Sequence, residues 1–274
     1  RIRCKRFGWL YFFLYGASPA VCDSFVEKNK HDLESLPGGG LYKPNSTSLR
    51  MGDLGYISKA QDDLNISYNT LDDYCLDLEN ALTTPYKAYQ EIGEFVDDKR
   101  VQLNTSVIQI ENEYYSTIRP KRVCPTGERP VNVLRTKGIE YLELRCVDLD
   151  PFSPVGVRRD QLDFMDTLLM YCLLKESPPI GREEAETRKS NHEKIINNGR
   201  DLNQIINLNG KAKTSLDKLI ELSNPSMSST KIPLYSAKRL FLMFVNALIN
   251  FSSLYSLPVV VLIISNSSNV FFFT

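Results

Sequence analysis

Apolar and polar side chains alternate over most of the segment 139–145, and this pattern favours a β-strand. The sequence predicts that the strand extends over 138–147. Alternation directs Ile139, Tyr141, Glu143 and Arg145 to one face, and Glu140, Leu142 and Leu144 to the other. A carboxylate and a guanidinium on one face can hold a magnesium ion and a phosphoryl oxygen respectively. A structural ion pair between Glu143 and Arg145 is the alternative, and the pattern alone leaves both open.

An earlier strand is predicted over 102–115, because its β-branched residues favour extended backbone. One face would then carry two carboxylates and a phenol, from Glu111, Glu113 and Tyr115. Like charges on one strand need compensation. A basic turn predicted at 119–122 offers Arg119, Lys121 and Arg122 for this purpose. A purely structural network of these charges is the alternative to a functional one.

The polar loop 48–56 contains Arg50 and Tyr56 together with Gly52 and Gly55. Glycines let the backbone approach a small ligand closely, and a carboxylate would suit the arginine. A solvated arginine is the alternative. The two histidines, His31 and His192, lie in charged surroundings and are predicted at the surface.

Apolar residues at helical spacing predict helices over 71–82 and 160–172, and a third helix is predicted over 183–198. Asn69 is the expected N-cap of the first helix and Asp160 that of the second. The third helix is predicted to be exposed and to end at Gly199. A further buried helix is expected within 7–22, which is too short and too interrupted to span a bilayer.

The charge balance excludes strong electrostatic attraction to nucleic acid, since 33 basic residues face 33 acidic ones. Six widely spaced cysteines form no CxxC pair, which indicates reduced thiols in a cytoplasmic protein. The chain starts at an arginine without a signal-like segment, so its beginning is interpreted as a cut.

The chain is almost wholly apolar over 240–264. Three interpretations stay open for this apolar tail: translation outside the proper frame, a membrane anchor, or a buried helical hairpin. The sequence therefore predicts a folded region over 1–225 and an aberrant, possibly membrane-spanning tail over 226–274. A membrane partner is expected only if the tail is genuine.

Five motifs occur in order along the chain: Arg6-Phe7-Gly8-Trp9 with Gly16-Ala17-Ser18-Pro19-Ala20; Thr47-Ser48-Leu49-Arg50 with Asp53-Leu54-Gly55-Tyr56; Gln109-Ile110-Glu111-Asn112-Glu113-Tyr114-Tyr115 with Ile118-Arg119-Pro120-Lys121-Arg122; Gly138-Ile139-Glu140-Tyr141-Leu142-Glu143-Leu144-Arg145; and Asp150-Pro151-Phe152-Ser153-Pro154-Val155-Gly156. With these motifs the chain resembles the C-terminal part of bacterial type 1 glutamate–cysteine ligase, also called γ-glutamylcysteine synthetase. The resemblance is lost by about residue 225.

The resemblance implies an α+β fold, a glutamine synthetase-like antiparallel sheet curved into a funnel with helices outside, which is incomplete in this chain. It also implies ATP and Mg²⁺ as cofactors, L-glutamate and L-cysteine as substrates, and a γ-glutamyl phosphate on the way to the first product of glutathione biosynthesis. The family's N-terminal part is missing, so the fragment is expected to be inactive by itself. A related ligase with another amine substrate and a noncatalytic membrane-tethered relic are the alternatives.

The resemblance also assigns roles to individual residues. Glu143 matches a magnesium ligand, and Arg145 matches the catalytic arginine that binds the nucleotide's transferring phosphoryl group. Tyr56 and Tyr115 match tyrosines that bind the cysteine carboxylate, and Arg50 stands beside them in substrate binding. Four further motif positions receive no individual role: Glu111, Glu113, Arg119 and Arg122.

Overall fold

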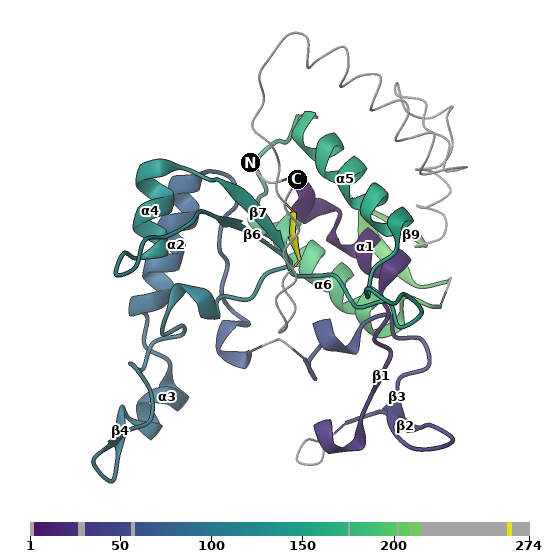
Figure 1. Cartoon of the computed structure of the whole chain (residues 1–274), viewed down its shortest axis with the longest axis horizontal. Coiled ribbons are helices and arrows are strands. Elements are labelled where there is room, and N and C mark those ends of the chain that lie inside the picture. The colour runs from purple at the N-terminus through teal and green to yellow at the C-terminus, as the bar shows by residue number, and fades with distance from the viewer. Residues whose placement is uncertain are drawn as a thin grey trace. The chain divides into compact units, whose positions relative to one another are not determined.

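The computed structural model describes residues 3–26, 31–55, 58–174, 176–201, 203–208 and 210–214, and the backbone of 262–264 (Figure 1). The chain divides into two compact units, which are described separately. The first comprises Arg1–Ile2, Tyr56–Arg145 and Val260–Thr274, and the second comprises Arg3–Gly55 and Cys146–Val259.

Two helices pack together in the first unit. Helix α2 (Leu71–Thr83) is capped by Thr70, whose hydroxyl accepts a hydrogen bond from the Asp73 backbone, so the cap lies one residue after the predicted Asn69. Its buried residues at helical spacing pack on α4 (Pro130–Lys137), which begins at a proline and ends at Gly138. The buried side chains are Tyr74, Cys75, Leu78 and Ala81 of α2 and Val131, Val133 and Leu134 of α4.

The sheet of the first unit contains β6 (Ile118–Lys121), β7 (Tyr141–Leu144) and β10 (Leu262–Ile264), in the order β10-β7-β6. Strands β6 and β7 are antiparallel, whereas β10 is parallel to β7. The predicted strand over 138–147 is therefore confirmed in its central part. The basic turn predicted at 119–122 is wrong, because its first three residues belong to β6. The edge position of β6 tolerates Pro120, which has no N–H to donate.

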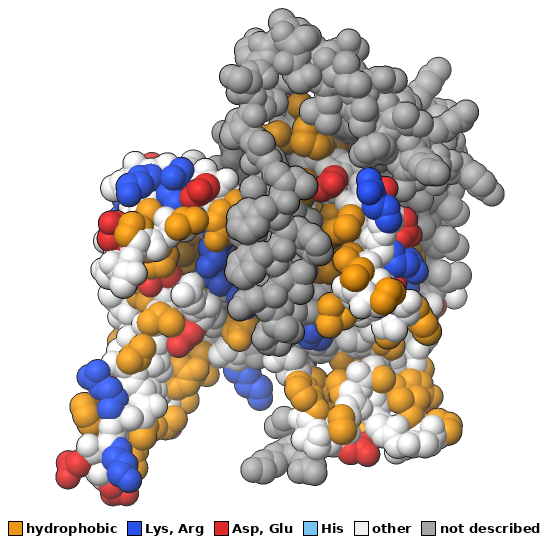
Figure 2. All heavy atoms as spheres, in the orientation of Figure 1, with side chains coloured by type: hydrophobic (Ala, Val, Ile, Leu, Met, Phe, Trp, Pro, Cys, Tyr) orange, Lys and Arg blue, Asp and Glu red, His pale blue; other side chains and the backbone are white. Residues whose placement is uncertain are grey.

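An arm of the first unit contains α3 (Lys87–Ile92), followed by the hairpin of β4 (Phe95–Val96) and β5 (Lys99–Arg100). Figure 2 shows hydrophobic side chains at the surface of this arm. Its exposed hydrophobic residues include Ile92, Phe95 and Val96. The strand predicted over 102–115 is wrong, since this segment contains no described strand and ends in a 3-10 helix at Glu111–Glu113.

The second unit is mainly helical, with α1 (Gly8–Tyr15), α5 (Arg159–Leu174) and α6 (Arg182–Asn198). Helix α1 is buried over most of its length, as predicted, and packs on α6. The prediction that the third helix is exposed is wrong, because Asn191, Ile195 and Ile196 of α6 are buried. Helix α5 starts before Asp160, which therefore lies in its first turn instead of at the cap.

Three short strands form an antiparallel sheet in the order β1-β3-β2, from β1 (Ala20–Val21), β2 (Glu34–Ser35) and β3 (Leu41–Tyr42). A separate hairpin joins β8 (Ile205–Leu208) to β9 (Lys211–Thr214). Four short 3-10 helices complete the remaining connections: Arg3–Arg6, Asp23–Phe25 and Leu49–Met51 in the second unit, and Lys59–Gln61 in the first.

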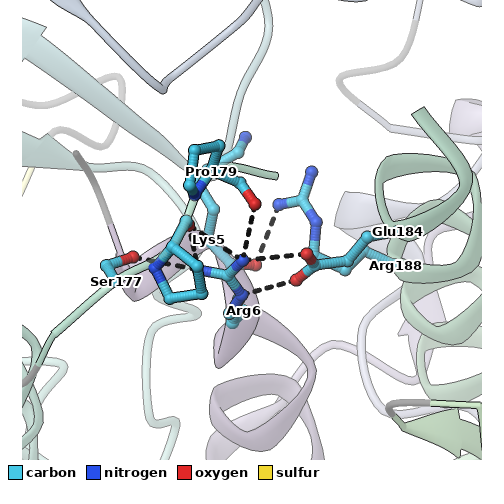
Figure 3. A network of polar contacts seen from close by, with 7 residues as sticks. Lys5, Arg6, Ser177, Pro179, Glu184 and Arg188 are labelled. Carbon is cyan, nitrogen blue, oxygen red and sulfur yellow. Dashed lines mark hydrogen bonds and ion pairs between the residues drawn. The ribbon is translucent and has the colours of Figure 1, made fainter. Parts of the chain in front are cut away.

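A polar network ties the start of the second unit to α6 (Figure 3). Arg6 Nη2 lies 2.8 Å from Glu184 Oε2, and Arg6 Nη1 donates to Ser177 Oγ over 2.9 Å. Arg188 Nη1 donates to the Lys5 carbonyl over 3.1 Å. Side chains far apart in sequence thus fix the N-terminal 3-10 helix against α6.

His192 is half-buried on α6, with its Nε2 atom fully buried, so its predicted surface position is wrong, whereas His31 is exposed as predicted. The rings of His192 and Phe12 form a T-shaped contact with 5.6 Å between their centroids, and His192 Nε2 has no hydrogen-bond partner among the described residues. The pKa of His192 is lowered to about 3, mainly by burial and to a smaller extent by the positive charges of Lys5 and Arg188. The imidazole is therefore neutral in the folded chain at neutral pH.

Acid is expected to destabilise the second unit through His192. The unfolded imidazole binds a proton near its ordinary pKa of 6.5, whereas the folded one stays neutral to about 3. This contribution to stability is complete above the unfolded pKa and falls with pH below it, by at most about 1.4 kcal/mol per pH unit. Urea unfolding of wild type and His192→Phe at several acidic pH values measures it. Equal pH dependence in the two proteins would assign the effect to other groups.

Only the backbone of 262–264 is described in the apolar tail, so the boundary predicted at residue 225 and most of 226–274 lie outside the described residues. Among the described helices, none is long and apolar enough to cross a membrane. All six cysteines are free, as the sequence predicts. The mixture of helices and small, mostly antiparallel sheets confirms the α+β class.

Candidate active site

Glu143 faces two cationic side chains across the β6–β7 pair. Arg119 is its direct cross-strand partner, and Lys121 lies two residues further along the same face of β6. Glu143 Oε2 is 4.0 Å from Arg119 Nε and 3.9 Å from Lys121 Nζ. Sequence alternation alone suggested Arg145 as the ionic partner of Glu143, but strand pairing brings these two cations to it from β6.

The contacts around Glu143 leave polar atoms unsatisfied. Neither Glu143 Oε2 nor Arg119 Nε has a hydrogen-bond partner among the described residues, although both atoms are buried. Arg119 is 5% exposed and is held by the carbonyls of Glu111 and Asn112, at 3.0 and 3.2 Å. Burial, and next the charge of Arg119, lowers the pKa of Lys121. A buried oxygen without a donor is able to bind a further ligand.

The described residues fit one part of a magnesium site. The unsatisfied carboxylate oxygen of Glu143 is a ligand of the type that Mg²⁺ prefers. No group of three or more His, Cys, Asp or Glu residues able to hold a metal occurs within the described part of the chain. Glu143 can therefore supply one ligand, but the described residues do not form a complete cluster of such ligands around it.

Arg145 and Tyr115 lie together in the same unit. The guanidinium carbon of Arg145 is 5.5 Å from the centroid of the Tyr115 ring, within the range of a cation–π contact. The Arg145 backbone donates to the Thr117 carbonyl over 2.9 Å, and the Tyr115 backbone donates to Gln61 Oε1 over the same distance. Tyr115 is 38% exposed, so a ligand has access to it.

Glu111 and Glu113 do not share a strand face with Tyr115, because they lie in the 3-10 helix. Glu111 Oε1 is 3.1 Å from Arg129 Nε, and Glu113 Oε2 accepts a hydrogen bond from the Gln109 backbone over 2.6 Å. These contacts are those of a structural network. Arg122 likewise donates through Nε to the Gly138 carbonyl over 2.7 Å.

Arg50 belongs to the second unit, where it meets a residue that the sequence analysis missed. Its Nε lies 2.8 Å from Asp148 Oδ1, and its Nη2 donates to the Val147 carbonyl over 2.9 Å. Asp148 is only 2% exposed. The signal in the sequence is a single carboxylate within the apolar run 146–149, a position where a charge needs a partner. Tyr56 lies outside the described residues.

Comparison with known proteins shows which family the chain resembles. The sequence model of the glutamate–cysteine ligase family matches residues 2–195. A glutamate–cysteine ligase of Alcanivorax borkumensis is 47% identical over 201 residues, which are 72% of this chain and 38% of that protein. One of Pseudomonas putida is 44% identical over 218 residues, which are 80% of this chain and 42% of that protein. The chain thus spans about two fifths of the length of these relatives.

A solved structure gives the same result. The glutamate–cysteine ligase of Francisella tularensis, in complex with AMP, superposes with a TM-score of 0.77 at 35% sequence identity. The match covers 90% of this chain and 50% of the Francisella chain. The five motifs, the α+β architecture and these matches agree, and the chain belongs to the glutamate–cysteine ligase family.

Proposed function

We propose that this chain carries part of the active site of an ATP-dependent ligase that joins the γ-carboxylate of L-glutamate to the amine of L-cysteine. The observation that carries the proposal is the buried, unsatisfied carboxylate oxygen of Glu143 between Arg119 and Lys121, on the strand that leads to Arg145. Family membership supports the reaction, and the AMP bound by the Francisella relative supports an adenine nucleotide as cosubstrate.

A free carboxylate is a poor electrophile, so the reaction needs two steps. An oxygen of the glutamate γ-carboxylate attacks the γ-phosphorus of ATP, the bond to the bridging oxygen breaks, and ADP leaves. The cysteine amine then attacks the acyl carbon, the carbon–oxygen bond to phosphate breaks, and the amine loses a proton. The products are γ-glutamylcysteine, ADP and phosphate.

The residues of the first unit suit the first step. Glu143 is proposed as one ligand of magnesium, which neutralises charge between phosphate and carboxylate when bound. Arg119 and Lys121 hold the Glu143 side chain in place. Arg145 is proposed to bind the transferring phosphoryl group through its planar, two-pronged donor.

The amino-acid carboxylates are proposed to meet Tyr56, Tyr115 and Arg50. A phenol hydroxyl donates one hydrogen bond to a carboxylate, and an arginine is able to donate two in parallel. Tyr115 remains partly exposed while Arg145 contacts its ring.

The proposed activity is tested in an extended enzyme, a fusion that supplies the part of the Alcanivorax borkumensis ligase that this chain lacks. With ATP, Mg²⁺, glutamate and cysteine, the extended enzyme is expected to form γ-glutamylcysteine, whereas residues 1–274 by themselves are not, because their magnesium site is incomplete. A folded extended enzyme that forms no dipeptide would contradict the proposal. So would turnover by the isolated chain at a comparable rate.

Tyr115→Phe in the extended enzyme is expected to raise the KM for cysteine about ten- to a hundredfold, since a hydrogen bond to a charged group contributes about 1.5–3 kcal/mol. The ring under Arg145 remains, so the phosphoryl-transfer residues are undisturbed. The KM for glutamate is expected to change less. Steady-state kinetics with each amino acid varied in turn measure both constants, and an equal rise in the two would indicate general disruption instead.

A further inference from the structure

Asp148 is a buried carboxylate that joins three segments of the second unit. Its Oδ2 accepts hydrogen bonds from the Ala17 backbone and from Ser18 Oγ, both over 2.9 Å. Its Oδ1 lies 2.8 Å from Arg50 Nε. Only 2% of the Asp148 surface is exposed, and a carboxylate at so buried a position requires such hydrogen-bond and ionic partners.

The loop that carries Arg50 is fixed against the same segment. The Leu49 backbone donates to the Ser18 carbonyl over 2.7 Å, and the hydroxyls of Ser18 and Ser48 are 3.1 Å apart. A Cβ at Gly55 would lie 1.7 Å from the Arg50 carbonyl oxygen, so only glycine allows the loop to close there. Both the backbone and the side chain of Arg50 are therefore restrained.

The Arg50 side chain keeps 21% of its surface exposed although it is anchored through Nε and Nη2. A ligand can reach it, and the anchoring has already removed much of the rotamer freedom that an arginine otherwise loses on binding. If Asp148 bound Arg50 only to stabilise the fold, the Arg50 side chain would not need to be accessible to a ligand.

We propose that Asp148 is the positioning residue that holds Arg50 ready for an amino-acid carboxylate. The inference rests on the proposed function, in which Arg50 binds substrate. Asp148 itself does not meet the substrate and acts through Arg50. It orients the guanidinium and anchors the loop 48–50 to 17–18.

The test compares Asp148→Asn, Arg50→Lys and the double variant in the extended enzyme. An asparagine that keeps its oxygen toward Ala17 and Ser18 presents an amide donor to Arg50 Nε, so it releases Arg50 while it preserves the packing. Glu184→Gln is the matched control, because it removes the charge from another arginine–carboxylate pair of the same unit, that of Arg6 (Figure 3).

Asp148→Asn is expected to raise the KM for one of the two amino acids about tenfold, with kcat changed less than about twofold. Arg50→Lys is expected to raise the KM for the same amino acid, and the double variant should be no worse than Arg50→Lys, because both changes act on one contact. Glu184→Gln should leave both KM values unchanged.

A second measurement does not depend on activity. In the isolated chain, the Nε–Hε proton of Arg50 should exchange slowly with water, and Asp148→Asn should accelerate this exchange while thermal unfolding remains cooperative. Glu184→Gln should leave the Arg50 signal unchanged.

The outcomes separate the two claims. No change in either KM for Arg50→Lys would overturn the substrate role of Arg50 and with it the proposed positioning. A raised KM for Arg50→Lys with additive effects in the double variant, or with unchanged Arg50 exchange in Asp148→Asn, would overturn the positioning role alone. Equal losses of kcat in Asp148→Asn and in the Glu184→Gln control would assign Asp148 a structural role.

Discussion

Glu143→Gln in the extended enzyme is expected to lower kcat about a thousandfold or more, since a metal ion stabilises transition-state charge by several kcal/mol and each 1.36 kcal/mol is a factor of about ten. The amide preserves shape but cannot act as an anionic ligand. Excess Mg²⁺ should recover part of the rate. Turnover titrated with Mg²⁺, together with the melting temperature, measures both effects.

The stability measurement is needed because Glu143 also faces Arg119 and Lys121. Loss of its charge leaves two cations facing each other, which destabilises the β6–β7 pair. Glu79→Gln is the control, because it breaks an ion pair with Arg135 elsewhere in the same unit and should leave turnover unchanged. A folded Glu143→Gln enzyme with normal turnover would remove Glu143 from the active site.

Arg145→Lys is expected to lower kcat about a hundredfold or more. An arginine that contacts a transferring phosphoryl group raises kcat by a factor of about 10³–10⁵, and a lysine in its place retains only the charge. The cation over the Tyr115 ring is preserved in part, so the KM for cysteine should change less than kcat. Initial rates at saturating ATP, glutamate and cysteine measure the loss.

Arg135→Lys is the matched control for Arg145→Lys, since Arg135 forms a two-pronged pair with Glu79 on the surface of the same unit. It should retain normal turnover. If Arg145→Lys turned over normally while it remained folded, the guanidinium would have no role in phosphoryl transfer.

The strand 139–145 could be predicted because alternation is a local signal. Strand β6 could not, because Pro120 and its basic neighbours are typical of a turn, and only pairing with β7 makes them a strand. The segment 102–115 has strand-forming residues, but its side chains bond to nearby backbone instead. Asn104 accepts from the Ser106 backbone, and Glu113 from that of Gln109.

The candidate site was predictable in part for the same reason. Glu143 and Arg145 stand in a recognisable motif. The positions of Arg119 and Lys121 opposite Glu143 could not be predicted, because they follow from the register in which β6 pairs with β7. Asp148 was missed because its donors lie 98 to 131 residues away in sequence, and no local pattern reports such contacts.

Oxygen transfer from glutamate to phosphate measures the proposed phosphoryl transfer most directly. The extended enzyme is given ATP, Mg²⁺, cysteine and glutamate labelled with oxygen-18 in its γ-carboxylate, and the released phosphate is analysed by mass spectrometry. A carboxylate oxygen that attacks phosphorus leaves with the phosphate, so each phosphate should carry one labelled oxygen, with ADP as the other product. Unlabelled phosphate, or AMP and pyrophosphate in place of ADP, would contradict the account.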